Sequence, residues 1–321
     1  MSHVIYSIII PIYNEEEVLT ESYTKIKAVM EQADAPYELI FVNDGSRDTS
    51  LALLRDLSSS DATLRVISFS RNFGHQNAIS AGMDYAKGDA IICIDADLQD
   101  PPEVMLQMIE KWKEGYHVVY GKRKSREGDN AFKKATAHVY YRLLRALTTV
   151  EIPVDVADFR LIDRQVCDVL NNNIRERNRY IRGLVAWVGY NQTFVEYVRD
   201  KRFAGETKYP LKKMIKFATD GITAFSYFPL KIATRIGFLI SLVSFFHICF
   251  VIFQTLILKN TVDGWASTMS VILFSQGIVL MMLGIIGEYI GRIFQEIKNR
   301  PLYVVQETLG YNNLVKEERN I

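Results

Sequence analysis

The segment with the clearest capacity for chemistry is Asp95-Ala96-Asp97, which follows an apolar run at residues 90–94. One residue separates the two aspartates, so in an extended chain both carboxylates project from the same face. Such hard oxygen ligands suit Mg²⁺ or Mn²⁺, which bind through one or two carboxylates and complete their shell with substrate phosphates and water. A cation held here would neutralise a diphosphate leaving group. The alternative is a solvated turn, and the spacing alone does not decide between the two.

Two further acids of this segment, Asp100 and Glu103, flank Pro101-Pro102. Proline favours the first turn of a helix, and acidic side chains there interact favourably with the helix dipole. We therefore expect these two carboxylates to serve a helix start and to need no metal.

Polar clusters also follow the first two apolar runs of the chain. Tyr13-Asn14-Glu15 come after residues 4–12, and Asp44 comes after residues 37–43. Ligands of open α/β sheets bind at the carboxyl ends of the strands, so these residues and the Asp95 segment should face one crevice. The first turn, PIYNEEE, has no glycine and three acids, so it matches neither the dinucleotide fingerprint nor the P-loop.

The elements that must position these residues alternate between strand and helix. Apolar runs predict strands at residues 4–12, 37–43, 64–69, 90–94 and 117–120, and amphipathic patterns predict helices at 16–33, 48–59, 75–87 and 103–114. Continuous apolar strands separated by amphipathic helices are typical of an α/β fold with a mostly parallel sheet covered on both faces.

Composition narrows the class of protein. The 321 residues can form one large domain or two ordinary ones, and a formal net charge of +1 offers no basic excess for nucleic acid. The three cysteines are far apart and form neither a metal motif nor a disulfide framework, which favours a reducing compartment. The N-terminal apolar run is short and lacks a basic region and a cleavage site, so it predicts a strand and not a signal peptide.

Two long apolar stretches lie in the last third of the chain. Residues 232–258 contain one charged side chain and residues 266–286 contain none, so each could form a helix that crosses a bilayer. A buried hairpin of a soluble protein is the alternative, but it would need a polar face. Basic residues flank the outer ends of the pair, and the positive-inside bias then places both termini in the cytoplasm of a plasma-membrane protein.

Six motifs resemble, in their order along the chain, those of the family 2 glycosyltransferases. They are PIYNEE (11–16), VNDGSRDTS (42–50), SRNFGHQNAISAGMDYAKGD (70–89), DADLQDPPE (95–103), ADFRL (157–161) and FAGETKYPLKKM (203–214). More narrowly, the chain is similar to the polyisoprenyl-phosphate glycosyltransferases, such as dolichyl-phosphate mannose synthase and the bacterial undecaprenyl-phosphate glucosyltransferases. The resemblance implies a Rossmann-like GT-A domain that transfers one sugar from a nucleotide sugar to a polyprenyl phosphate, with inversion.

The resemblance also assigns roles to residues of this chain. It implies that Pro11, Tyr13 and Glu15 line the pocket for the base and the ribose, and that Asp44 binds one of these groups. Turn chemistry is the alternative for Asp44, since Asp-Gly-Ser forms turns readily. It further implies that Asp95 and Asp97 hold the metal and the diphosphate, with Gln99 beside them.

Asp158, in the motif ADFRL, matches the position of the catalytic base. The implied acceptor is a phosphate monoester whose second pKa is ~6, so near neutral pH it is already largely a nucleophile. A carboxylate there would orient the acceptor or stabilise positive charge at the sugar carbon more than it would remove a proton. The alternative is a structural pair with Arg160.

Basic segments are expected where a lipid phosphate meets the protein. Residues 199–216 contain seven Lys or Arg and two Asp or Glu, and the pattern continues as an amphipathic helix that suits a membrane interface or packing on the catalytic domain. Arg202 and Lys208 are the candidates for the acceptor phosphate. In the basic segment 121–134, Lys122 and Arg123 either meet the donor diphosphate or belong to a solvated loop.

These inferences combine into one expectation. A GT-A domain (1–198) is followed by interfacial amphipathic helices (199–231), a two-helix transmembrane hairpin (232–290) and a cytoplasmic tail (291–321). The expected reaction moves glucose from UDP-glucose to undecaprenyl phosphate with Mg²⁺ or Mn²⁺, and N-acetylglucosamine, galactose or mannose are alternative sugars. A processive polysaccharide synthase and an inactive membrane adaptor are the other readings. The arginine-rich residues 175–182 suit either a contact between subunits of a homo-oligomer or solvent, and His75 is the one histidine near the expected crevice.

Overall fold

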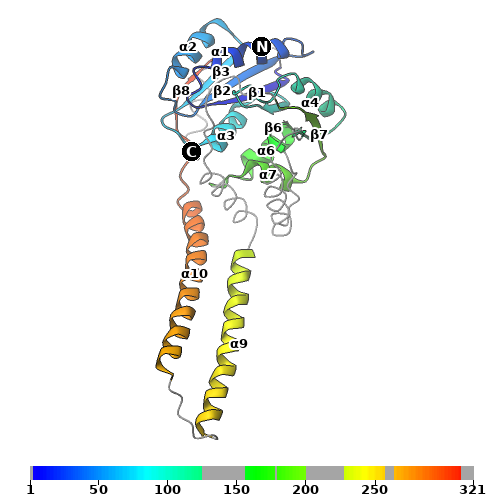
Figure 1. Cartoon of the computed structure of the whole chain (residues 1–321). Coiled ribbons are helices and arrows are strands. Elements are labelled where there is room, and N and C mark those ends of the chain that lie inside the picture. The colour runs from blue at the N-terminus through cyan, green and yellow to red at the C-terminus, as the bar shows by residue number, and fades with distance from the viewer. Residues whose placement is uncertain (1–2, 125–155, 178, 200–227, 257–263, 312–321) are drawn as a thin grey trace. The chain divides into compact units, whose positions relative to one another are not determined.

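The computed structural model describes residues 3–124, 156–177, 179–199, 228–256 and 264–311 (Figure 1). The described residues form two compact units. One unit is an α/β domain and the other contains two long helices.

The α/β unit contains an eight-stranded sheet in the order β7-β5-β6-β4-β1-β2-β3-β8. The strands are β1 (Tyr6–Ile12), β2 (Tyr37–Asn43), β3 (Leu64–Phe69), β4 (Ala90–Cys93), β5 (Val118–Arg123), β6 (Val156–Asp163), β7 (Gln192–Tyr197) and β8 (Val305–Leu309). The helices are α1 (Leu19–Met30), α2 (Ser50–Ser60), α3 (His75–Tyr85), α4 (Val104–Lys113), α6 (Arg164–Asn172) and α7 (Ile181–Val188).

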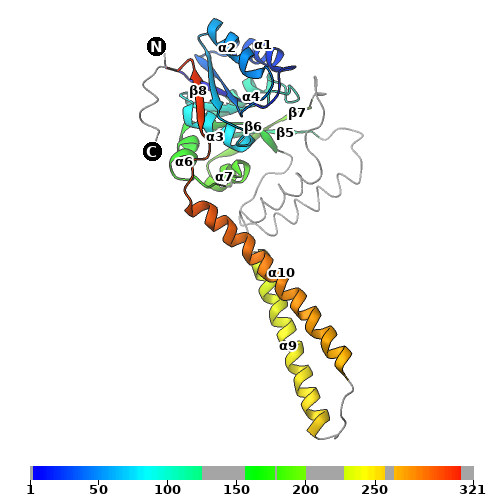
Figure 2. The same cartoon turned by 90° about the vertical axis from the view of Figure 1, so that its left-hand side faces the viewer.

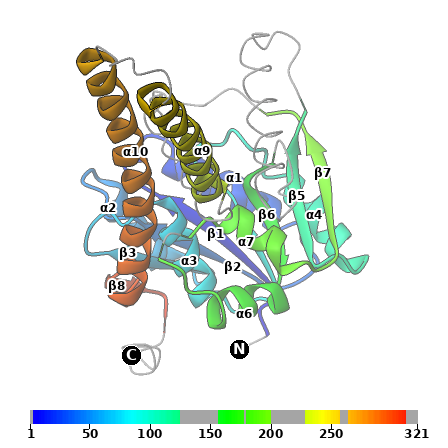
Figure 3. The same cartoon turned by 90° about the horizontal axis from the view of Figure 1, so that it is seen from below.

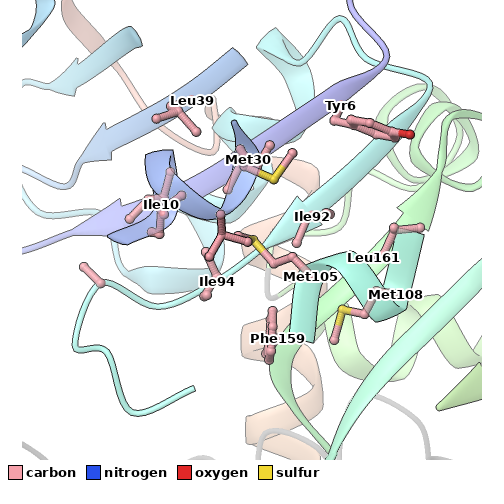
Figure 4. Packing of buried hydrophobic residues seen from close by; sticks show 14 of the residues in the cluster. Tyr6, Ile10, Met30, Leu39, Ile92, Ile94, Met105, Met108, Phe159 and Leu161 are labelled. Carbon is pink, nitrogen blue, oxygen red and sulfur yellow. The ribbon is translucent and has the colours of Figure 1, made fainter. Parts of the chain in front are cut away.

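Apolar side chains cover both faces of the sheet, as the strand pattern predicts. On one face, alternate residues of β1 such as Ile8 and Ile10 pack with α1 and α4 in a fully buried cluster (Figure 4). On the other face, Ile9 of β1 contacts α3 so closely that a Cβ on Gly82 would lie 2.3 Å from its side chain. Figure 3 shows α3, α6 and α7 as neighbours, and contacts join α3 to α6 and α6 to α7. Burial of each large aliphatic side chain contributes about 1.5–3 kcal/mol, so this double layer fixes the sheet.

The sheet is mixed, whereas the sequence predicts a mostly parallel one. The central strands β4, β1, β2 and β3 are parallel, as expected. However, β6 lies antiparallel between β4 and β5, and β8 lies antiparallel to β3 at the edge. These two strands were not predicted, because both pair with strands that are distant in the sequence. The result is a Rossmann-like GT-A arrangement with antiparallel additions.

The antiparallel course of β6 matters for the site. Cys93 of β4 lies opposite Arg160 of β6. Continuing this antiparallel register two residues forward from Cys93 and two residues back from Arg160 places position 95 opposite Asp158. The beginning of β6 therefore lies at the same sheet edge as the carboxyl end of β4.

The second unit consists of α9 (Phe228–Leu256) and α10 (Trp265–Ile297), which lie side by side in Figures 1 and 2. Many of their large apolar side chains are exposed, including Phe238 at 72% and Phe274 at 71%. Within the described residues, one stretch, Phe274–Ile297, is long and apolar enough to cross a membrane, with a mean hydropathy of 1.7.

Candidate active site

The loops after the first two strands are joined by side-chain to backbone hydrogen bonds. Asn14 has a positive φ of 53°, and its backbone nitrogen donates to Ser46 Oγ at 3.0 Å, while its Oδ1 accepts from the Arg47 nitrogen at 2.8 Å. The candidate nucleotide-binding residues lie in the first of these loops or in the strand before it. Pro11 is buried in β1, Tyr13 is 38% exposed, and the Glu15 nitrogen donates to Ser50 Oγ at 3.1 Å. Tyr13 and Glu15 therefore lie where the loops after β1 and β2 meet.

Asp44 holds the loop that follows β3. Its carboxylate is buried and accepts hydrogen bonds from the backbone nitrogens of Phe73, at 2.6 Å, and Gly74, at 3.0 Å. Burial raises the pKa of Asp44, although these two hydrogen bonds oppose the shift. Gly45 adopts a φ of 64°, and a Cβ there would lie 2.4 Å from the Arg71 carbonyl carbon, so only glycine allows this approach. Asp44 thus joins two strand-end loops, which goes beyond the local turn considered from the sequence.

Asp95 and Asp97 follow β4 as predicted. Asp97 accepts a hydrogen bond from the Gln99 nitrogen at 3.2 Å, around Leu98, whose φ is 55°. The Asp95 side chain is 31% exposed. Burial raises the pKa of Asp95 to about 6, with His75 opposing the shift and Asp158, Asp100 and Asp97 adding to it. A cation bound beside such closely spaced carboxylates would reduce their mutual repulsion and favour their ionised forms.

The donor set at this edge fits a hard divalent cation that also binds substrate. No group of three or more His, Cys, Asp or Glu side chains in metal-binding geometry occurs among the described residues. Asp95 and Asp97 would therefore hold Mg²⁺ or Mn²⁺ as a pair, with diphosphate oxygens and water as the remaining ligands.

Asp158 lies at the centre of a charged cluster. Its Oδ1 accepts from Arg160 at 2.6 Å and lies 3.8 Å from the Arg182 guanidinium. Its Oδ2 accepts from Gln76 Nε2 at 3.2 Å and lies 3.4 Å from His75 Nε2. Burial opposes ionisation, yet His75, Arg182 and Arg160 together hold the pKa of Asp158 well below its usual range. The carboxylate is therefore ionised at neutral pH, and it forms the pair with Arg160 that was the structural alternative to a catalytic role.

His75 bridges the two carboxylate groups of the site. Its Nε2 lies 3.5 Å from Asp95 Oδ1 and 3.4 Å from Asp158 Oδ2. Burial lowers its pKa, but the two carboxylates outweigh this effect and raise the pKa to about 9. The sequence marks His75 only by its place near the crevice, and it gives no role to Gln76 or Arg182. The available signal was that His75 and Gln76 begin the helix that follows β3.

The contacts of Asp100 differ from those expected of an acid at a helix start. It is fully buried and accepts hydrogen bonds from Tyr197, at 2.6 Å, and Arg123, at 3.2 Å, with the Arg199 guanidinium 3.6 Å away. The prediction that Asp100 serves a helix start is therefore wrong. Its partners lie 23 and 97 residues away in the sequence, so a local pattern could not indicate them.

Lys122 and Arg123, the two candidate diphosphate contacts on β5, have different partners in the structure. Arg123 pairs with Asp100, whereas Lys122 pairs with Glu196 at 3.1 Å and lies 4.3 Å from the centre of the Phe194 ring. Adjacent residues of a strand point to opposite faces, so the two cations do not form one cluster. Arg202, Lys208 and the rest of the interfacial segment through residue 227 lie outside the described residues.

Comparisons with known proteins identify the family to which this fold belongs. Residues 7–170 match the glycosyl transferase family 2 model, and residues 228–293 match the GtrB C-terminal hairpin model. The chain belongs to glycosyltransferase family 2 and is a glycosyltransferase, which confirms the resemblance seen in its motifs.

Three relatives are similar over nearly the whole chain. An uncharacterised glycosyltransferase of Bacillus subtilis, YkcC, is 56% identical over 97% of this chain and 96% of the relative. An uncharacterised glycosyltransferase of Synechocystis, sll0501, is 46% identical over 98% of both chains. The prophage-derived bactoprenol glucosyl transferase of Shigella flexneri is 41% identical over 94% of this chain and 97% of the relative.

Proposed function

We propose that the protein transfers one glucose from UDP-glucose to a polyprenyl phosphate, such as undecaprenyl phosphate, with inversion at the sugar carbon. The observation that carries the proposal is the convergence of Asp95 and Asp158 at one sheet edge, bridged by His75. The choice of acceptor and sugar is supported by the Shigella flexneri relative, which is a bactoprenol glucosyl transferase. N-acetylglucosamine, galactose and mannose remain the alternative sugars for the same acceptor.

In this proposal the strand-end loops bind the donor. Tyr13 and Glu15 would receive the base and the ribose beside Pro11, and Asp44, which holds the neighbouring loop, would bind one of these groups. Asp95 and Asp97, with Gln99 beside them, would hold Mg²⁺ or Mn²⁺. When bound, the ion would supply positive charge to the diphosphate leaving group. Lys122 and Arg123 remain the proposed basic contacts to the donor diphosphate, although in this structure Arg123 is paired with Asp100 and Lys122 with Glu196.

Asp158 acts on the acceptor side of the reaction. An oxygen of the lipid phosphate forms a bond to the sugar C1, and the C1–O bond to UDP breaks as UDP departs with the electron pair. At neutral pH the phosphate needs little deprotonation, because its second pKa is ~6. The ionised Asp158 would instead orient the acceptor and stabilise positive charge at C1, while Arg160, Arg182 and His75 offset its repulsion of the phosphate.

The helical unit would attach the enzyme to the plasma membrane. We infer that α9 and α10 form a two-helix transmembrane hairpin, with the catalytic domain and both termini in the cytoplasm. The match of residues 228–293 to the GtrB C-terminal hairpin and the apolar Phe274–Ile297 stretch support this inference. Arg202 and Lys208 remain the proposed contacts to the acceptor phosphate.

A donor panel tests the proposal. Purified full-length protein receives undecaprenyl phosphate and, one at a time, labelled UDP-glucose, UDP-N-acetylglucosamine, UDP-galactose and GDP-mannose, with Mg²⁺, with Mn²⁺ and with chelator. We expect one glucose per lipid and loss of product with chelator. A long saccharide chain would favour a processive synthase, and no product from any donor would favour an inactive adaptor.

A further inference from the structure

A short segment after α10 belongs to the α/β unit. This segment, Leu302 to Gly310, is called the strap here, and it lies beyond both matched segments, 7–170 and 228–293. Within it, β8 runs antiparallel to β3, from Val66 opposite Leu309 to Phe69 opposite Val305. In addition, the Val304 carbonyl accepts a hydrogen bond from the Ser70 nitrogen at 3.0 Å. The strap thus holds both the end of β3 and the first residue of the following loop.

Tyr303 of the strap contacts both β3 and α3. Its ring stacks on Phe69, with ring centres 4.9 Å apart and planes 14° apart. Its hydroxyl donates a hydrogen bond to Asp84 Oδ2 at 2.6 Å, and Arg175 pairs with the same carboxylate at 2.7 Å. Asp84 belongs to the last turns of α3, so Tyr303 ties the strap to both β3 and α3.

Phe69 continues the contact toward the nucleotide side of the site. Its ring meets the ring of Phe73 edge to face, with centres 5.7 Å apart, and the Arg71 guanidinium lies 3.9 Å from the centre of the Phe73 ring. The backbone nitrogen of Phe73 is the donor of the 2.6 Å hydrogen bond to Asp44. One aromatic side chain therefore separates Tyr303 from the loop that Asp44 holds.

We propose that Tyr303 is a positioning residue for nucleotide-sugar binding. It fixes Phe69, and through Phe69 it fixes the loop from Ser70 to Gly74 against Asp44. The inference rests on the proposed function, because it takes Asp44 to be part of the nucleotide pocket. Stacked aromatic pairs contribute to stability beyond the area they bury. Loss of the ring should therefore loosen the loop from Ser70 to Gly74 and weaken donor binding. The turnover step should change less, because His75 keeps its own contacts with Asp95 and Asp158.

The experiment compares three variants of the full-length, detergent-solubilised protein. Tyr303→Ala removes the ring, and Tyr303→Phe keeps the ring but removes the hydrogen bond to Asp84. Glu307→Gln is the matched control, because it breaks the 2.5 Å ion pair between β8 and Arg55 on α2 without contact to Phe69. Calorimetry measures the Kd of UDP and, in parallel, of GDP, each with Mn²⁺, and a transfer assay measures KM for the donor and kcat.

For Tyr303→Ala we expect KM and Kd to rise about tenfold, with kcat within about twofold of the wild type. Tyr303→Phe and Glu307→Gln should leave both constants within about twofold. A purely structural role would instead lower the melting temperature and the active fraction without a selective change in KM.

Unchanged Kd and KM in Tyr303→Ala, beside normal nucleotide binding by the wild type, would overturn this inference and leave the proposed function standing. Equal defects in Tyr303→Ala and Tyr303→Phe would also overturn it, because the hydrogen bond and not the stacked ring would then carry the effect. A wild type that binds neither nucleotide and transfers no sugar would overturn the proposed function, and this inference with it.

Discussion

The Asp158 carboxylate lies 2.6 Å from the Arg160 guanidinium, although the two residues belong to the same strand and are separated by one residue. Because β6 is antiparallel to β4, the same carboxylate also meets His75, which in turn lies 3.5 Å from Asp95. With Arg182 3.8 Å from Asp158, two carboxylates and three cationic side chains meet at this sheet edge.

Asp158→Asn should reduce transfer by at least about 100-fold, because a neutral amide cannot stabilise positive charge at the sugar carbon. The Kd of UDP should stay within about threefold, because the contacts of Asp158 go to His75, Gln76 and Arg160 and the candidate nucleotide residues are on other loops. Steady-state transfer and calorimetry measure the two effects. Asp163→Asn is a control in the same strand, because Asp163 caps α6 and accepts from Trp112 at 2.7 Å. Transfer within tenfold of wild type in Asp158→Asn would contradict the assignment.

Asp97→Ala should also reduce transfer by at least about 100-fold, through loss of a metal ligand. Asp97 is half-buried, so the melting temperature should change by no more than about 2 °C. Glu103→Gln is the control, since its side chain is exposed and has no assigned ligand role. Activity should likewise disappear with chelator and return with Mg²⁺ or Mn²⁺. Normal turnover of Asp97→Ala in the presence of divalent metal would rule out this metal site.

Asp100→Asn should destabilise the fold rather than change the chemistry directly. The buried Asp100 carboxylate is the shared partner of Arg123, Tyr197 and Arg199, and removal of one member of a buried ion pair costs about 3 kcal/mol. The apparent melting temperature should fall by about 6 °C or more. Glu114→Gln breaks an exposed pair with Lys111 and should change it by less than about 2 °C. Equal melting temperatures for the two variants would contradict the importance of the buried cluster.

Asp61 should make the stability of the domain depend on pH below about pH 4. Burial opposes its ionisation, but hydrogen bonds from Lys27, Thr63 and Tyr23 more than offset this and hold the pKa of Asp61 well below its usual range. A carboxyl with a lowered pKa stabilises the fold above its unfolded pKa of about 4, and the stabilisation is lost as the pH falls toward the folded pKa.

Asp61→Asn should therefore lower the melting temperature at pH 7 by about 4 °C, corresponding to about 2 kcal/mol. The difference from wild type should shrink as the pH falls below about 4. Asp56→Asn, at an exposed position on α2, is the control. A difference that stays constant from pH 7 to pH 3 would show that Asp61 is not the titrating group.

The parallel centre of the fold was predictable because its signals are local. The apolar runs of β1 to β4 alternate with amphipathic helices, so the strand ends that carry Tyr13, Asp44 and Asp95 could be placed at one edge. The same reasoning could not place Asp158, because its position depends on antiparallel pairing between β4 and β6. Its assignment came from resemblance, and the structure adds the contacts with His75 and Arg182.

The other differences between the predicted and the observed structure arise from partners that are distant in the sequence. Asp100 was interpreted from its neighbouring prolines, yet its hydrogen bonds go to β5 and β7. β8 was not predicted, since its partner β3 precedes it by more than two hundred residues and the apolar helices come between them. Patterns of neighbouring residues predict strands and helices, but they do not indicate which buried charges meet after the chain has folded.

The most direct test of the central claim is the mass of the lipid product formed from undecaprenyl phosphate and UDP-glucose by full-length protein with Mg²⁺ or Mn²⁺. The wild type should form a lipid that carries one hexose through its phosphate, and Asp158→Asn should form at least about 100-fold less of it. A lipid that carries several sugars, or equal product from Asp158→Asn and wild type, would contradict it.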